Sequence, residues 1–206
     1  ELFKFILSTT AKYNIDESHD ISHSIDVLHI AHNIYEHEKY KNPNIIPHQN
    51  IIYVSAVLHD MCDKKYMDES KGIEEISTFL QDELKFNDND KQIILSIIST
   101  MSYSTVKKNG FPDLGEYQTA YHIVREADLL AAYDFDRCLI YGIKHLGESL
   151  EHAMERAEKL FNTRIFKHYE DNLLITDYSK NNHIPLQLHA VNRIQTWKEI
   201  ITNLPN

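Results

Sequence analysis

The spacing of the apolar residues is the feature that most limits how this chain can fold. Across most of its 206 residues, apolar side chains recur every three or four positions, and the chain contains only five glycines and five prolines. A period near 3.6 puts such side chains on one side of an α-helix, and scarce glycine and proline leave long helices unbroken. The sequence therefore predicts an all-α protein, a bundle of helices.

The periodic segments predict a series of helices joined by polar turns. Asp20 is a candidate N-cap for a long amphipathic helix that runs to residue 40, and Pro47 opens a helix with an apolar middle that runs to residue 62. Residues 104–118 hold two glycines and a proline, so we expect a loop there. Further helices are expected over residues 71–84, 89–103, 119–132, 134–146, 148–174 and 185–204.

Composition argues against two classes of binding partner, nucleic acids and membranes. The formal charge of −10 argues against a broad nucleic-acid surface, and no apolar run is long enough to cross a bilayer. Cys62 and Cys138 cannot form a disulfide framework, and the first thirteen residues are too short and polar for a secretory signal. We expect a cytoplasmic protein with no nucleic-acid or membrane partner. A small anionic substrate remains compatible, because a bound cation can reverse the potential inside one pocket.

Four side chains of metal-binding type lie on three predicted helices that are far apart in the sequence. They are His23, His59, Asp60 and Asp128. Each alone is an ordinary polar residue, and only folding could bring them together. Imidazole and carboxylate ligands in one site suit a hard or borderline divalent ion. We expect one such ion, manganese first, with magnesium, cobalt, nickel and iron(II) as alternatives.

The motifs around these positions resemble a known family. The "HD" that closes an apolar helix, the upstream "SHSIDVLHIA" and the downstream "VREADLLAA" resemble the HD-domain metal-dependent phosphohydrolases. More narrowly, "HDMCDKKY", "IISTMSYS" and "VREADLLAAYDFDR" are similar to a branch of small bacterial HD proteins that includes nucleoside triphosphate pyrophosphohydrolases. The resemblance implies that the metal ligands are His23, His59, Asp60 and Asp128.

The resemblance also implies the domain organisation. We expect a single HD domain over residues 1–206, with a metal-binding core of about residues 18–137 and C-terminal helices of about residues 148–203 packed on it. Family members with two metal ions carry extra histidines between the His-Asp pair and the last aspartate. Here only His122 lies in that interval, which favours one ion. Asp26 stands where family members often have arginine, and the metal ligands are not affected by that difference.

Residues next to the motif are candidates for catalysis. Asp63 would lie one turn beyond His59 if the helix continued, where it could orient the attacking water or accept its proton. Lys64 and Arg125 are candidates to hold phosphate or stabilise the leaving group, with Lys65 as a further candidate. The simpler interpretation of both lysines is a solvated charge at a helix C-terminus.

Three more residues are candidates to line the substrate pocket. His19 lies one helical turn before His23 and could face the same cleft. Tyr66 and Tyr103 flank the motifs and could stack on a nucleobase, although packing at the rim of a core is the more common role of tyrosine.

The leading functional expectation, implied by the resemblance, is hydrolysis of a nucleoside triphosphate or deoxynucleoside triphosphate to the monophosphate and pyrophosphate. Hydrolysis of (p)ppGpp is an alternative, but those enzymes show HDxxED where this chain has "HDMCDK", with Asp63 for glutamate and Lys64 for aspartate. The sequence also fits a nucleoside monophosphate phosphatase, or a non-catalytic module that senses nucleotides or binds a protein. A homodimer is compatible with the sequence but not predicted by it.

Overall fold

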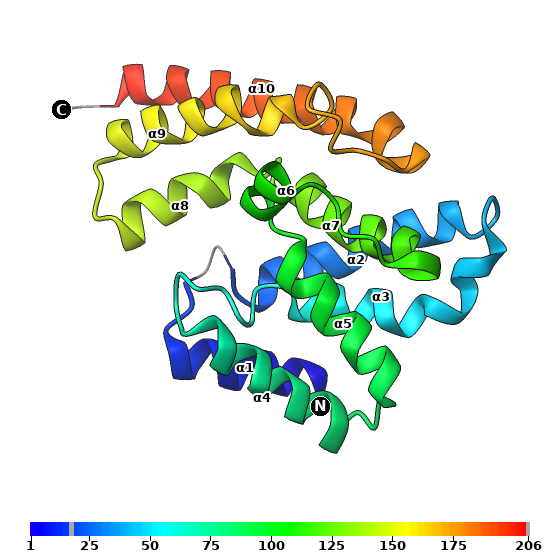
Figure 1. The fold of residues 1–206 in the computed structure, drawn as a ribbon. Helices are drawn as coiled ribbons and strands as arrows, with labels where there is room; N and C mark the ends of the chain where they lie inside the picture. The colour runs from blue at the N-terminus through cyan, green and yellow to red at the C-terminus, as the bar shows by residue number, and fades with distance from the viewer. Residues whose placement is uncertain (17–18, 205–206) are drawn as a thin grey trace.

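Helices account for the regular structure of residues 1–16 and 19–204, which the computed structural model describes (Figure 1). The all-α class predicted from the sequence is confirmed, and no strand occurs in those residues. The α-helices are α1 (Leu2–Tyr13), α2 (Ile21–Glu38), α3 (Gln49–Leu58), α4 (Glu69–Asp82), α5 (Asp88–Thr100), α6 (Tyr103–Asn109), α7 (Gln118–Ala131), α8 (Phe135–His145), α9 (Leu150–Thr163) and α10 (Asp177–Asn203). Short 3-10 helices are η1 (Pro43–His48), η2 (Gly115–Tyr117) and η3 (Ile165–Lys167).

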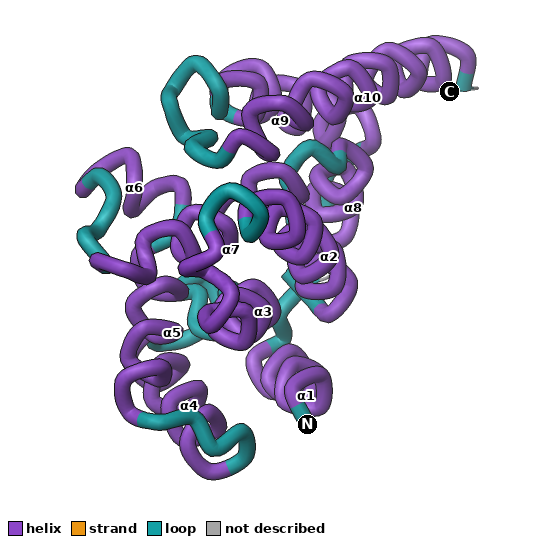
Figure 2. Tube along the Cα trace, turned by 90° about the vertical axis from the view of Figure 1, so that its right-hand side faces the viewer, coloured by secondary structure: helices purple, strands orange, loops and turns teal. Residues whose placement is uncertain are grey.

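Three helices form the centre of the molecule. α2, α3 and α7 pack on one another, and α5 covers α3 (Figures 1 and 2). α3 is apolar almost throughout and is buried from Ile51 to Leu58 apart from a half-buried Tyr53, so it can only lie inside a bundle. This arrangement brings the end of α3 close to α2 and α7.

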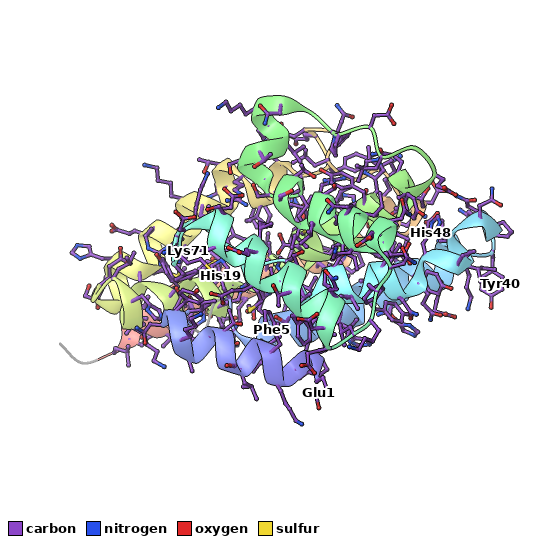
Figure 3. The ribbon with its side chains drawn as sticks, turned by 60° about the horizontal axis from the view of Figure 1, so that its bottom comes forward. Glu1, Phe5, His19, Tyr40, His48 and Lys71 are labelled. Carbon is purple, nitrogen blue, oxygen red and sulfur yellow. The ribbon has the colours of Figure 1, made fainter. Side chains whose placement is uncertain are left out.

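The C-terminal helices form a layer over one side of this centre. α8 and α9 pack as an antiparallel pair, and α10 lies along α9 and reaches α2 and α7 (Figure 1). One continuous cluster of buried side chains runs from Ile6 in α1 to Ile194 in α10. The N-terminal helices close the other side, where Phe5 of α1 points toward α4 and stacks on Phe79 (Figure 3).

Side-chain caps explain several helix starts that the sequence predicted. The Asp20 carboxylate accepts a hydrogen bond from the backbone of Ser22 and starts α2, and Asp134 caps α8 in the same way through Arg137. α4 and α5 begin with similar caps, at Asp68 and Asn87. These four starts agree with the predicted segments to within a few residues.

Four predicted boundaries were wrong, and one of them is the end of the helix expected over residues 148–174, since α9 ends at Thr163. The helix expected to reach residue 62 ends at Leu58, and a series of turns follows it. Part of the predicted loop is helical, because Ser102 caps the short helix α6 before Gly110 ends it. The last helix starts at Asp177 rather than Pro185, because Thr176 caps it and the helix continues through the proline.

None of the helices in the described part of the chain has the length and apolar character that a membrane crossing requires.

Candidate metal centre and its pocket

Two short stretches of local structure bring the histidines together. The cap at Asp20 fixes the start of α2, which places His23 one turn inside, almost fully buried and facing α3. His59 is the C-cap of α3, and its Nδ1 donates to the Ala56 carbonyl at 2.9 Å. Because a carbonyl only accepts, this bond orients the other nitrogen, Nε2, inward, where it lies 3.2 Å from His23 Nε2.

Two carboxylates complete the group. Asp60 Oδ2 lies 3.0 Å from His59 Nε2 and 3.5 Å from His23 Nε2. Asp128, in the last turn of α7, places Oδ1 3.2 Å from His23 Nε2 and 3.7 Å from His59 Nε2. The structure therefore brings together all four residues that the sequence singled out, although His59 lies 36 positions after His23 and Asp128 lies 68 positions after Asp60 (59 − 23 and 128 − 60).

The spacing of these atoms fits a shared cation. Two ligands at right angles on an ion with bonds of about 2.1 Å lie about 3.0 Å apart, close to the separations of 3.0–3.7 Å found here. Asp60 Oδ2 is buried and accepts no hydrogen bond of regular geometry among the described residues. His23, His59 and Asp60 are thus a group that could hold a metal ion, with Asp128 against both histidines.

The pKa of each side chain in the group depends on its burial and on the charges of the others. Burial alone would lower the pKa of His59, but the Asp60 and Asp128 carboxylates outweigh it and raise that pKa to about 9. Burial lowers the pKa of His23. Burial would raise the pKa of Asp60 and of Asp128, but the neighbouring histidines hold both below the usual range. Both aspartates are therefore ionised and available as ligands at neutral pH.

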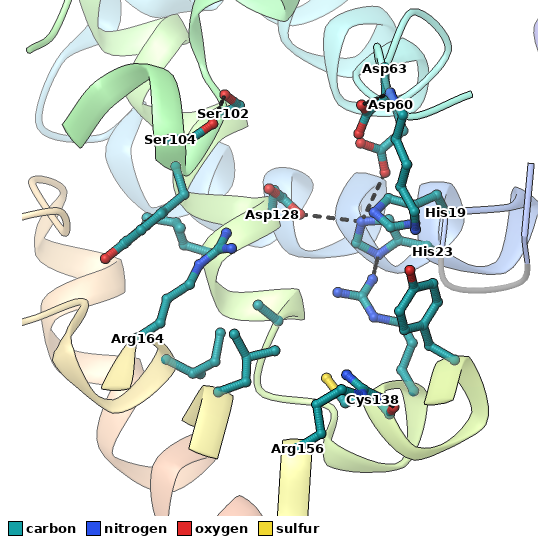
Figure 4. Close-up of a pocket in the computed structure, with 18 residues that line it drawn as sticks. His19, His23, Asp60, Asp63, Ser102, Ser104, Asp128, Cys138, Arg156 and Arg164 are labelled. Atoms are coloured by element: carbon teal, nitrogen blue, oxygen red, sulfur yellow. Dashed lines mark hydrogen bonds and ion pairs between the residues drawn. The ribbon is translucent and has the colours of Figure 1, made fainter. Parts of the chain in front are cut away.

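Three members of the group, His23, Asp60 and Asp128, line one wall of a pocket of about 460 Å³, and His59 lies behind them (Figure 4). Arg137 of α8 reaches across and donates to His23 Nδ1, the ring nitrogen that faces away from the other ligands. His19 and Asp63 also line the pocket next to Asp60, and these three could form a second, more exposed group of ligand atoms.

Asp63 reaches the pocket by a route that the sequence did not predict. Since α3 ends at Leu58, Asp63 lies in a turn rather than on the next turn of the helix, and its carboxylate accepts a hydrogen bond from the Lys65 backbone at 2.8 Å. It still faces the pocket (Figure 4). Asp63 therefore lies next to the cluster as expected, but in a turn and not on a helix.

The two lysines after Asp63 occupy different positions. Lys64 is exposed and is not among the residues that line the pocket. Lys65 lines the pocket, with its ammonium group 3.0 Å from Asp16 and 4.0 Å from the centre of the Tyr141 ring. Of the two, only Lys65 is placed to meet a ligand, so the prediction that favoured Lys64 does not match the structure.

Of the two tyrosines predicted to line the pocket, only Tyr103 does so. The Tyr66 hydroxyl lies 2.9 Å from His19 Nδ1 and donates to Asp16, so it supports the rim of the pocket without lining it. Tyr103 lines the pocket directly.

Arg125 lies outside the pocket. Its side chain is buried, its guanidinium lies 3.1 Å from the Glu126 carboxylate, and it stacks over Phe111. α7 is enclosed nearly all round at this level, so a residue one turn before Asp128 is held in the core. The structure gives Arg125 a packing role and no contact with the pocket.

The sequence missed the basic wall of the pocket. Arg137, Arg156 and Arg164 line it from α8, α9 and the residue that follows α9. One signal was available: Arg156, Leu160 and Arg164 recur every four residues, as expected for one face of a helix. The direction of that face depends on how α9 folds back on α8, which local sequence does not state.

Comparison with known proteins supports the fold alone. No family model and no curated protein matches the chain. A crystal structure of a Lactobacillus plantarum protein, a structural genomics target, matches with a TM-score of 0.71 over 98% of this chain and 95% of that chain, at 21% sequence identity. The similarity shows that the two proteins share a fold, and the name of that protein states no activity.

Proposed function

We propose that this protein is a metal-dependent phosphohydrolase of the HD type that acts on nucleotides, and that it converts nucleoside triphosphates to monophosphates and pyrophosphate. The observation that carries the proposal is the convergence of His23, His59, Asp60 and Asp128, three of which (His23, Asp60 and Asp128) line a pocket whose other wall is basic. A metal group facing arginines suits a phosphorylated ligand.

Manganese is our first choice for the ion, because mixed imidazole and carboxylate ligands suit such a cation. His23, His59, Asp60 and Asp128 would hold it. When bound, the ion would lower the pKa of a water molecule and polarise a phosphoryl oxygen.

The residues of the chain supply the other functions. Asp63 faces the pocket next to Asp60, where its carboxylate can orient the attacking water and accept its proton. Lys65 and Arg137 line the pocket and can stabilise negative charge that develops on the phosphate. Leu129 and Leu160 make part of the wall apolar, which strengthens these interactions by limiting water.

The decisive test combines a product assay with one substitution. With Mn²⁺, the protein should release pyrophosphate from ribonucleoside or deoxyribonucleoside triphosphates. Asp60→Asn should bind Mn²⁺ at least about 100-fold more weakly and lose the activity, while its circular dichroism spectrum stays unchanged. Asp177→Asn is a matched control, since it removes an exposed carboxylate that pairs with Lys41 outside the pocket.

Other products would identify other functions. Action on monophosphates alone, or on ppGpp alone, would replace the pyrophosphohydrolase proposal with one of those activities. Absence of bound metal, with no phosphate or pyrophosphate released from any nucleotide, would contradict the enzyme itself.

A further inference from the structure

The pocket has a second charged region, away from the metal ligands. His23, Asp60 and Asp63 lie on one side in Figure 4, and Arg164 points into the pocket from the other side, with Asp128 between them in that view. Arg164 follows the last residue of α9, so this region comes from the C-terminal layer of the fold.

The other cations of the pocket have partners within the protein. Arg156 donates to Glu148 at 2.8 Å and to the Cys138 carbonyl at 2.7 Å. Lys65 forms an ion pair with Asp16. Arg137 donates to His23. Their charges and hydrogen-bond donors are at least partly used.

Arg164 lacks such a partner. Among the residues that the structure describes, no carboxylate lies within ion-pair distance of it, and its Nε is buried without a hydrogen bond. Its guanidinium lies over the Tyr103 ring, 4.1 Å from the ring centre. Stacking on an aromatic ring holds the guanidinium plane in a fixed direction but leaves its edge donors free.

An anion is the ligand that this arrangement best accommodates. Arg164 is half-buried and its buried Nε makes no hydrogen bond, which is unfavourable, and a phosphate group offsets this cost by accepting two parallel hydrogen bonds from the guanidinium. A neutral nucleobase would supply no opposite charge. Arg137, in the same pocket, adds to the positive potential.

We propose that Arg164, held by Tyr103, binds a phosphate group of the substrate other than the one at the metal ligands. The inference rests on the proposed function and specifies its substrate class. A ligand that places a separate phosphate in each region carries at least two phosphate groups, so on this proposal the pocket selects nucleoside polyphosphates over monophosphates. Arg164 is then a residue that determines specificity.

The probe is inorganic tripolyphosphate, titrated into the full chain with Mn²⁺ in excess and compared with inorganic phosphate. The wild type should bind tripolyphosphate more tightly than phosphate. Arg164→Gln should weaken tripolyphosphate binding by about tenfold or more and leave phosphate binding within about twofold. Mn²⁺ affinity should not change.

Lys167→Gln is the matched control. It removes the same charge three residues away, from an exposed side chain that pairs with Glu170 and does not line the pocket. It should leave tripolyphosphate binding within about twofold. If Arg164→Gln does not fold, Arg164→Lys keeps the charge without the planar fork and should give an intermediate loss.

The two proposals can fail separately. If the protein hydrolyses nucleotides but Arg164→Gln binds tripolyphosphate like Lys167→Gln, the Arg164 subsite is overturned and the enzyme stands. If the protein shows no hydrolytic activity, and its binding of tripolyphosphate still depends on Arg164, the subsite stands and the enzymatic proposal is overturned.

Discussion

His59 must lose a proton before it can bind a metal ion. Its Nδ1 is engaged by the Ala56 carbonyl, so Nε2 is the nitrogen that faces the other ligands. The carboxylates of Asp60 and Asp128 raise its pKa to about 9 against the effect of burial, so the metal-free protein carries this proton at neutral pH. A cation that binds there has to displace it.

We therefore expect Mn²⁺ affinity to rise by about tenfold per pH unit below about pH 9 and to level off above it. Affinity rises with pH because protonated His59 cannot bind the ion, and this form becomes less populated as the pH rises. Calorimetric titration near neutral pH, in two buffers of different ionisation enthalpy, should show about one proton released per ion bound. A binding heat that does not depend on the buffer would contradict this expectation.

Single residues also show how far the site could be predicted. The four ligands were identifiable because their residue types stand at helix ends or on predicted helices in a known pattern. Arg125 was misplaced because sequence alone does not show that α7 is enclosed at that level. Arg164 was missed because its role depends on the packing of α9, a contact between distant parts of the chain.

At the scale of elements, Gly142 sets how closely α8 and α9 can pack. A Cβ built there would lie 2.9 Å from the Ala153 Cβ and would overlap atoms of both Arg156 and Glu148. Gly142→Ala should therefore destabilise the protein by about 1–3 kcal/mol, although alanine is the better helix former. Urea denaturation measures the change.

Ile143→Ala is the neighbouring control for this prediction. Ile143 follows Gly142 in α8, and its side chain is 42% exposed. Its replacement should change stability by less than about 0.5–1 kcal/mol. A Gly142→Ala protein as stable as the wild type would show that the two helices can separate without loss.

Several helix starts were predicted from their local caps, although the local cap of α6 at Ser102 was missed and the start of α10 also depends on distant contacts. Asp20 and Asp134 cap their own helices through neighbours in the sequence. The start of α10 also depends on Thr176, whose backbone and hydroxyl bind Glu126, 50 residues earlier. Local sequence therefore favours Pro185 as a helix start, whereas α10 begins at Asp177 and continues through this proline.

At the scale of the whole molecule, Glu126 joins the C-terminal layer to the centre. Its carboxylate accepts hydrogen bonds from the Ile175 backbone at 2.7 Å and from the Thr176 hydroxyl at 2.6 Å, and it pairs with Arg125. Glu126 is fully buried on α7, two residues before the candidate metal ligand Asp128. One helix, α7, therefore carries both the residue that holds α10 and a residue of the candidate site.

Glu126→Ala should reduce the free energy of unfolding by about 3–5 kcal/mol, because it leaves Arg125 buried without a counter-charge. Glu170→Ala is the control, since it removes an exposed carboxylate and should change stability by less than about 1 kcal/mol. Thermal and urea unfolding measure both. Equal stability of the two variants would show that the buried pair contributes nothing to the fold.

The pocket draws its two walls from different parts of the chain. The candidate metal ligands lie between residues 23 and 128, whereas the arginines lie between residues 137 and 164. On the proposed function, substitutions in α9 would therefore alter which anion is accepted without touching the four residues, whereas in α8 Arg137 also contacts His23. If the proposed function holds, proteins of this fold that keep the same four residues need not share a substrate.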